Sequence, residues 1–314
     1  MRVAVMGSGA IGLLYGGWLK LGGADVTFVA RGSRLEALKS GPLIAHGRLP
    51  FSLDNLNAVA DIREIDDVDA ILLAVKLYDL QAAATAALPA LRPAGSVVAI
   101  QNGINVFRDL KAILPPSKIA VGPVFSVTRI DEPLSISYGG AERVILGNPE
   151  CEVPAPAQAM VDIWRSVGVD ASISPEIDKI LWMKFVGLAT GAAINCLSRL
   201  PAGVVYHDEG ILEYVRQSIA EVIAVGQAEG IKFPDDIAEN ALKFLQSFPP
   251  TAVASMRLDL DAGKRLELEG ISGELVRLAK AHSIPTPFHS LAYAMLKPFV
   301  NGPNCSETNH PMRG

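Results

Sequence analysis

The sequence predicts an α/β domain built on a parallel sheet, followed by an all-α domain. The chain has 314 residues, of which 50% are hydrophobic, enough for about two domains with buried cores. Up to about residue 114, unbroken apolar runs alternate with helical patterns, as expected for parallel strands covered by helices on both faces. Beyond residue 175 the apolar spacing is helical throughout.

The elements follow in this order. The first unit is a strand over 2–6, a glycine-rich turn, a helix over 13–21 that ends at Gly22-Gly23, and a strand over 26–30. Strands over 69–75, 96–100, 121–130, 134–138, 143–146 and 169–173 follow, with helices over 33–38, 80–91, 106–114 and 155–167. Six helices are expected over 176–199, 209–229, 235–247, 251–262, 270–282 and 287–298. We therefore expect domains over 1–172 and 173–300, and a loose polar tail over 301–314.

Composition excludes several classes of partner. The net charge is −5 and no Lys/Arg-rich run is present, which argues against nucleic-acid and membrane partners. The three cysteines are far apart and the histidines show no metal spacing, so no metal site is expected and a cytoplasmic location fits. The apolar segment 180–197 contains Lys184 and Asn195, which favours a buried helix over a membrane span.

The glycine-rich turn carries the first functional signal. Gly7, Ser8, Gly9, Ala10, Ile11 and Gly12 form a GxGxxG motif between a predicted strand and a predicted helix. In a Rossmann-type domain these glycines permit the tight turn, the approach of a pyrophosphate and the packing of the helix. The alternative is a glycine-rich turn that binds no ligand. The position of the motif favours a dinucleotide site.

The end of the second strand indicates which dinucleotide binds. NAD enzymes place an acidic residue there to accept from the ribose 2′-hydroxyl, whereas this chain has Arg31, and Asp25 precedes the strand. A guanidinium can bind a 2′-phosphate through paired charge-assisted hydrogen bonds. The sequence therefore predicts NADP (NADPH), with Arg34 as a second candidate contact. Alternatively, both arginines are solvated surface residues.

Three further polar residues are candidates for chemistry. Lys184 lies among apolar residues, and burial of an ammonium lowers its pKa toward the range useful to a general acid. Asn102 and Lys76 follow predicted strands, where open α/β sheets bind ligands. The alternatives are a lysine that snorkels to the surface, an ordinary Asn-Gly turn and a loop lysine.

Together these motifs resemble the ketopantoate reductase (2-dehydropantoate 2-reductase) family, within the 6-phosphogluconate dehydrogenase-like group. The resemblance covers about residues 1–300. It is carried by Gly7–Gly12, Arg31, Ala74-Val75-Lys76, Gln101-Asn102-Gly103, Leu181-Trp182-Met183-Lys184-Phe185, and Ser255-Met256-Arg257-Leu258-Asp259 followed by Glu267.

The resemblance implies roles for individual residues. Lys184 matches the family's general acid, and Ser255 and Glu267 match residues that bind substrate. Asn102 and Lys76 match residues that contact both substrate and cofactor. The implied reaction is NADPH-dependent reduction of a 2-oxo acid, with ketopantoate as the leading substrate and pantothenate biosynthesis as the setting. A homodimer formed through the helical domain is left open.

The chain also departs from the family pattern. Leu188 and Ala192 stand where typical members have asparagines that help to hold the substrate, and Asn195 lies nearby. This favours, as an alternative, a related reductase of another oxo or imino compound. A regulatory protein that only binds NADPH is a second alternative.

Overall fold

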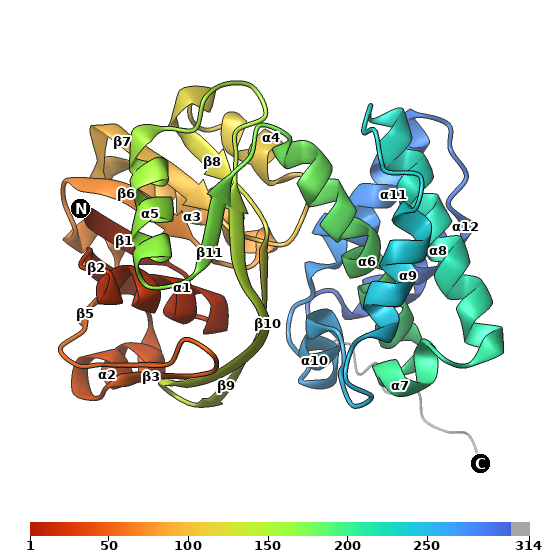
Figure 1. The fold of residues 1–314 in the computed structure, drawn as a ribbon, viewed down its shortest axis with the longest axis horizontal. Coiled ribbons are helices and arrows are strands. Elements are labelled where there is room, and N and C mark those ends of the chain that lie inside the picture. The colour runs from red at the N-terminus through yellow and green to blue at the C-terminus, as the bar shows by residue number, and fades with distance from the viewer. Residues whose placement is uncertain (303–314) are drawn as a thin grey trace, which may run out of the picture. The chain divides into compact units, whose positions relative to one another are not determined.

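The computed structural model of this protein describes residues 1–302. The chain divides into two compact units, Met1–Leu181 and Trp182–Gly314, whose elements are labelled in Figure 1. The boundary expected after residue 172 stays a prediction. The tail expected over 301–314 lies outside the described residues from residue 303 onward.

The first unit is built on a parallel sheet with the strand order β5-β2-β1-β6-β7-β8. Its strands are β1 (Arg2–Met6), β2 (Asp25–Val29), β5 (Asn57–Val59), β6 (Val68–Leu73), β7 (Leu91–Ala99) and β8 (Ile119–Val121). Met6 lies opposite both Val29 and Leu73, and Leu73 lies opposite Ala99. The carboxyl ends of β2, β1, β6 and β7 therefore meet at one edge.

Helices cover both faces of this sheet, as the sequence predicted. One face packs on α1 (Ala10–Leu21), α2 (Gly32–Ser40) and α5 (Ala155–Ser166), and the other on α3 (Leu80–Ala87) and α4 (Val106–Lys111). In β1, Val3 and Val5 join the first core while Ala4 and Met6 join the second, following the alternation of side chains along a strand. This two-sided burial explains the unbroken apolar runs.

A second sheet in the same unit has the order β11-β10-β3-β4, with β9 paired to β10. Its strands are β3 (Leu43–His46), β4 (Phe51–Leu53), β9 (Val124–Glu132), β10 (Ser135–Leu146) and β11 (Asp170–Ile173). The strand predicted over 121–130 is divided at Gly122-Pro123, where proline supplies no N–H to a ladder. The strands predicted over 134–138 and 143–146 are one strand, because an irregularity beside Gly140 (φ 85°) carries β10 through the break in pattern.

The sequence prediction missed several short elements. Strands β3, β4 and β5 have 4, 3 and 3 residues, too few to show a clear alternation. Helix α1 begins at Ala10 rather than at residue 13, since Gly9 is its N-cap residue and Ala10, Ile11 and Gly12 already form its first turn. Helix α3 ends at Ala87, and Leu91 already starts β7.

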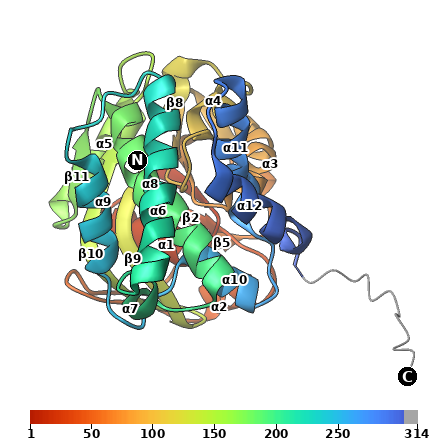
Figure 2. The same cartoon turned by 90° about the vertical axis from the view of Figure 1, so that its right-hand side faces the viewer.

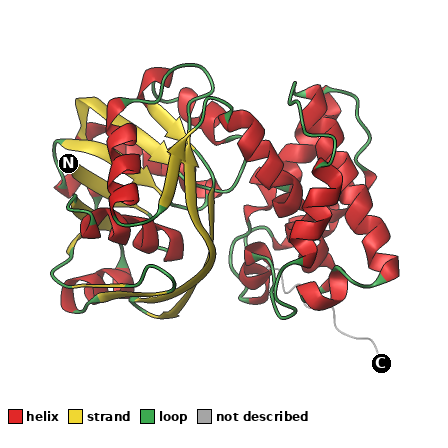
Figure 3. Ribbon diagram, in the orientation of Figure 1, coloured by secondary structure: helices red, strands yellow, loops and turns green. Residues whose placement is uncertain are grey.

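The described part of the second unit is helical, apart from an isolated bridge between Arg265 and Asn301 (Figure 3). Its helices are α6 (Ile177–Ser198) from Trp182 onward, α7 (Ala202–Val205), α8 (Glu209–Ala228), α9 (Ile237–Gln246), α10 (Ser255–Asp261), α11 (Ser272–Ala281) and α12 (Pro287–Leu296). Helix α8 packs against α9, α11 and α12 (Figure 2). The α/β-then-all-α fold class is therefore confirmed.

Helix α6 is long and apolar enough to cross a membrane by composition alone, but 72% of its most apolar window is buried within the structure. It therefore behaves as a core helix. On α6, Thr190 accepts from Ser218 Oγ at 2.9 Å, and Ser218 lies 2.9 Å from His289 Nε2. Ser272 Oγ lies 3.4 Å from His289 Nδ1, so buried hydrogen bonds join α6, α8, α11 and α12.

Candidate active site

The glycine-rich turn leaves open space where a phosphate would bind. Gly7 has φ +101°, and a Cβ there would lie 2.6 Å from the backbone of Ala74. A Cβ on Gly12 would lie 1.9 Å from the Gly7 carbonyl oxygen, whereas one on Gly9 meets nothing within 4 Å. The first turn of α1 carries no acidic residue. The N–H groups of Ala10 and Ile11 start this helix, so the turn can accept an anion over Gly9.

Arg31 lies at the end of β2, next to this turn. The hydroxyl of Ser8 donates to the carbonyl of Val29 at 2.8 Å, which ties the turn to the strand end. Arg31 is exposed and is the N-cap residue of α2, while Asp25 stands at the opposite end of β2. Asp61 lies close enough for the Arg31 charge to help lower the pKa of its carboxyl, although the hydrogen bonds from Arg63 are the larger cause.

Arg34 adds a second cation on α2. One Nη of its guanidinium is buried without a hydrogen-bond partner among residues 1–302, and burial lowers the pKa of the group. A buried guanidinium nitrogen is costly unless an anion or a polar group meets it. Arg34 is therefore, with Arg31, a cation that could meet an anionic group of a bound dinucleotide.

Lys76 and Asn102 reach the same edge of the sheet from neighbouring strands. Lys76 follows β6 and begins a one-turn 3₁₀ helix over Leu77–Asp79, and Asn102 follows β7; both are half-buried. Both amide atoms of the adjacent Gln101 are buried without a partner within the described part of the chain. The sequence motif Gln101-Asn102-Gly103 gives no sign of this burial, because burial of the Gln101 amide depends on the fold. These polar groups fit the amide and ribose of a nicotinamide nucleotide.

Within the helical unit, Lys184 lies in α6 and Glu267 in the 3₁₀ helix η5 (Glu267–Gly270). Burial lowers the pKa of the Lys184 ammonium to about 8, and the nearby charge of Glu267 opposes that change. Glu267 is itself 7% exposed. The fold therefore brings together an ammonium and a carboxylate that lie far apart in sequence.

Ser255, the third residue predicted in this unit, is exposed at the first position of α10. The residue before it is held by α6, because the N–H of Ala254 donates to Asn195 Oδ1 at 2.8 Å. Asn195 lies near the positions of the two missing asparagines, about a helical turn away. Its side chain instead binds the chain's own backbone.

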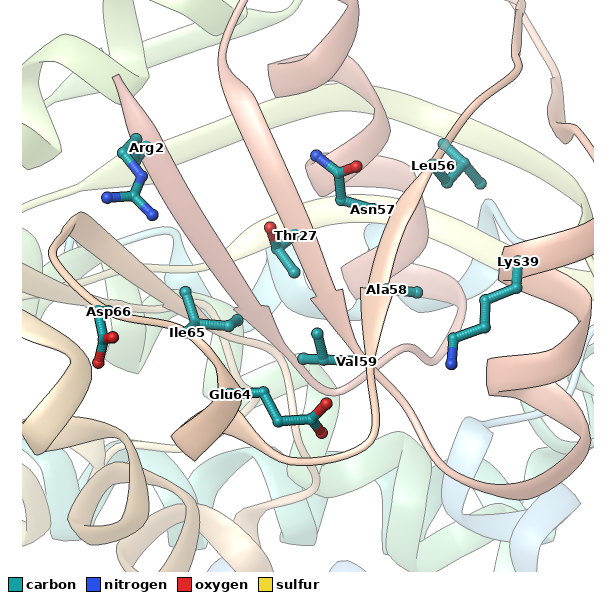
Figure 4. A pocket seen from close by; sticks show the side chains of 10 residues that line it. All are labelled: Arg2, Thr27, Lys39, Leu56, Asn57, Ala58, Val59, Glu64, Ile65 and Asp66. Carbon is teal, nitrogen blue, oxygen red and sulfur yellow. The ribbon is translucent and has the colours of Figure 1, made fainter.

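A surface hollow in the first unit lies apart from the predicted site residues. A hollow of about 560 Å³ is lined by Arg2, Thr27, Lys39, Leu56, Asn57, Ala58, Val59, Glu64, Ile65 and Asp66 (Figure 4). It lies along the edge strand β5 and contains none of the predicted site residues. Within residues 1–302, no group of three His, Cys, Asp or Glu side chains could hold a metal ion.

The chain is similar to known proteins over most of its length. The family model described as Ketopantoate reductase PanE/ApbA matches residues 3–150, and its C-terminal counterpart matches residues 176–300. An uncharacterized oxidoreductase, YkpB of Bacillus subtilis, is 26% identical over 95% of this chain and 98% of its own length. The 2-dehydropantoate 2-reductase of Archaeoglobus fulgidus is 29% identical over 90% of this chain and 92% of its own length.

Solved structures show the same fold. A PanE/ApbA family ketopantoate reductase from Ralstonia eutropha superposes with a TM-score of 0.86 and 28% identity, covering 95% of this chain and 98% of its own. A D-mandelate dehydrogenase, solved with NADH and anilino(oxo)acetate, superposes with a TM-score of 0.85 and 21% identity over the same shares. At that identity the second likeness shows the fold alone.

Proposed function

Because the chain belongs to the ketopantoate reductase PanE/ApbA family of oxidoreductases, we propose that it reduces a 2-oxo acid with NADPH, with ketopantoate as the leading substrate. The observation that carries this proposal is the desolvated Lys184 ammonium beside Glu267, with a pKa of about 8. A donor with such a pKa is protonated at neutral pH and gives up its proton more readily than an ordinary lysine.

In the proposed reaction Lys184 donates its proton to the ketone oxygen as negative charge develops there. NADPH, when bound, supplies the hydride that adds to the carbonyl carbon, so that the ketone becomes a secondary alcohol. Glu267 keeps the ammonium charged before transfer, since its carboxylate opposes the effect of desolvation. Lys184 is left neutral and regains a proton from solvent between turnovers.

The first unit would bind the cofactor through backbone N–H groups and positively charged side chains. The turn Gly7–Gly12 would receive the pyrophosphate, with Arg31 and Arg34 at the 2′-phosphate. Lys76 and Asn102, at the ends of β6 and β7, would orient the nicotinamide and the substrate carbonyl. The cation pair at the end of β2 is the reason for proposing NADPH rather than NADH.

The helical unit would supply the substrate contacts. The exposed hydroxyl of Ser255 is suited to a carboxylate oxygen, and Glu267 can accept a hydrogen bond from the terminal hydroxyl of ketopantoate. A site built to pair with a hydroxyl discriminates strongly against analogues that lack it. Reduction of ketopantoate would give pantoate and would place the enzyme in pantothenate biosynthesis in the cytoplasm.

A second candidate is reduction of a more apolar 2-oxo acid. Leu188 follows Lys184 by about one turn of α6, and Ala192 by about two, so neither position offers an amide to a hydroxylated substrate. The ring of Phe244, 53% exposed, covers Gly187, where an added Cβ would lie 3.4 Å from it.

A substrate panel tests the proposal. NADPH oxidation is followed with ketopantoate, with its analogue lacking the hydroxyl, and with branched and aromatic 2-oxo acids. We expect kcat/KM to be higher for ketopantoate than for the other acids. The ratio of kcat/KM for ketopantoate to kcat/KM for the analogue should be smaller in Glu267→Ala than in the parent protein. Faster turnover of the apolar acids moves the chain to the second candidate. NADPH binding without turnover of any acid would leave only a binding protein.

A further inference from the structure

From the structure we infer that Asn195 is a positioning residue, which fixes the substrate-binding hydroxyl of Ser255 to the helix that carries Lys184. This inference rests on the proposed function for the role of Ser255. Asn195 lies on α6, 2% exposed, roughly three turns beyond Lys184 and therefore on nearly the same side of the helix.

The side chain of Asn195 binds backbone on both sides of its amide. Its Oδ1 accepts from the N–H of Ala254 at 2.8 Å, and its Nδ2 donates to the carbonyl of Leu200 at 3.3 Å. Ala254 is the N-cap residue of α10, directly before Ser255. Because both halves of the amide are engaged, Asn195 acts through the backbone and not by touching substrate.

The segment before Ser255 needs such an anchor. Residues 252–254 belong to no helix or strand, so no regular ladder holds them. The start of α7 binds the segment further back, through Ala202 N–H to the Ala252 carbonyl at 2.8 Å and Gly203 N–H to the Pro250 carbonyl at 2.9 Å. Asn195 supplies the contact at the last residue before Ser255.

The two hydrogen bonds of Asn195 also connect the segment that follows α6 with the segment that precedes α10. Leu200 follows Arg199, whose φ of 59° is left-handed and turns the chain sharply after α6. By holding the Leu200 carbonyl and the Ala254 N–H together, one amide sets both the exit from α6 and the entry to α10. The rigid helix then fixes the separation of the Ser255 hydroxyl from Lys184, and a small error in such geometry lowers turnover.

Steady-state kinetics of three variants test the role. Asn195→Ala leaves the partly buried Ala254 N–H without its acceptor, and we expect KM for the 2-oxo acid to rise roughly tenfold. The affinity for NADPH should stay unchanged. The pH at which kcat falls as Lys184 loses its proton should also stay unchanged. Asn195→Asp keeps the acceptor for the Ala254 N–H but loses the donor to the Leu200 carbonyl, so it should recover only part of the rise in KM. Ser198→Ala is the control, because Ser198 binds the Ile194 carbonyl and the Leu200 N–H but not Ala254.

A double-mutant cycle separates positioning from general loosening. In a Ser255→Ala background, Asn195→Ala should raise KM by less than twofold, since the hydroxyl that it positions is absent. Equal effects of Asn195→Ala in both backgrounds would overturn the inference, as would a KM rise in Ser198→Ala as large as that in Asn195→Ala.

Amide hydrogen exchange keeps the test independent of the proposed reaction. The Ala254 amide should exchange slowly in the parent protein and at least tenfold faster in Asn195→Ala, with the amides of α8 unchanged. If no 2-oxo acid is turned over, the proposed function fails while this anchor is still measured. If exchange at Ala254 is unchanged in Asn195→Ala, the anchor itself is wrong.

Discussion

The carboxylate of Glu267 acts on the ammonium of Lys184 against the effect of burial, and the balance leaves the pKa of Lys184 at about 8 instead of 10.5. Burial without the Glu267 charge would lower the pKa of Lys184 further, so that the lysine would lose its proton at a lower pH. The Glu267 charge without burial would raise the pKa of Lys184 and make it a weaker acid. The combination is suited to a general acid that must be charged at neutral pH and still transfer its proton.

The first prediction concerns the pH dependence of Lys184. A general acid must carry its proton, so kcat should be constant below pH 8 and fall as pH rises through about 8. Lys184→Ala should lower kcat by roughly a hundred- to ten-thousand-fold while NADPH affinity survives. Steady-state rates and fluorescence titration of NADPH measure both. An unchanged kcat would transfer the proton-donor role to another residue, with Lys76 next in line.

Removal of the Glu267 charge should move the fall of kcat at alkaline pH, which we call the alkaline limb, to lower pH. Glu267→Gln keeps the size of the side chain but removes the charge that raises the pKa of Lys184. Glu269→Gln is the matched control, because Glu269 lies in the same 3₁₀ helix but bonds to Tyr293 and Lys297. A limb that stays in place in Glu267→Gln would show that this pair does not set the titration.

Arg31 should govern the choice between the two nicotinamide cofactors. Arg31→Ala is expected to weaken NADPH binding roughly ten- to a hundred-fold, the worth of a charged hydrogen bond, with little effect on NADH. Arg129→Ala, an exposed arginine paired with Asp131 in the second sheet, serves as the control. Equal affinity of the parent protein for NADPH and NADH would refute the cofactor assignment.

Two glycines of the nucleotide turn should respond differently to alanine. A methyl group on Gly9 meets nothing within 4 Å, and its φ of −80° suits any residue, so Gly9→Ala should keep Tm and lose NADPH affinity. A methyl group on Gly12 would lie 1.9 Å from the Gly7 carbonyl oxygen, so Gly12→Ala should lower Tm as well. Calorimetry and cofactor titration read the two effects separately. A lowered Tm in Gly9→Ala would show that the space is not open.

His289 should make the helical unit less stable in mild acid. Burial lowers its pKa from 6.5 to about 3, so the folded protein keeps it neutral while the unfolded chain takes up a proton below pH 6.5. Stability should therefore fall as pH drops from about 6.5 toward 3, by at most about 1.4 kcal/mol per pH unit from this group. Urea midpoints between pH 7 and 4.5 should show a shallower fall in His289→Leu than in the parent. Parallel curves would exclude His289 as the cause.

Much of the first unit was determined by the sequence itself, because its signals are local. The motif Gly7–Gly12, the apolar runs of β1, β2, β6 and β7, and Arg31 after β2 each lie within a few residues of chain. Parallel pairing then requires the strand ends to share an edge, so Lys76 and Asn102 were expected there. Strands of 3 or 4 residues, such as β4 and β3, carry too little pattern to be predicted.

The chemistry of the helical unit was decided by the tertiary structure. The sequence marked Lys184 as a lysine among apolar residues, but its approach to Glu267 depends on how η5 packs within that unit. The sequence also shows Asn195 near the missing asparagines but not what its amide binds. In the fold that amide forms hydrogen bonds with the backbone of Ala254 and Leu200. Helical periodicity tells which face of a helix is buried, and only the packing of the chain tells which distant group meets it.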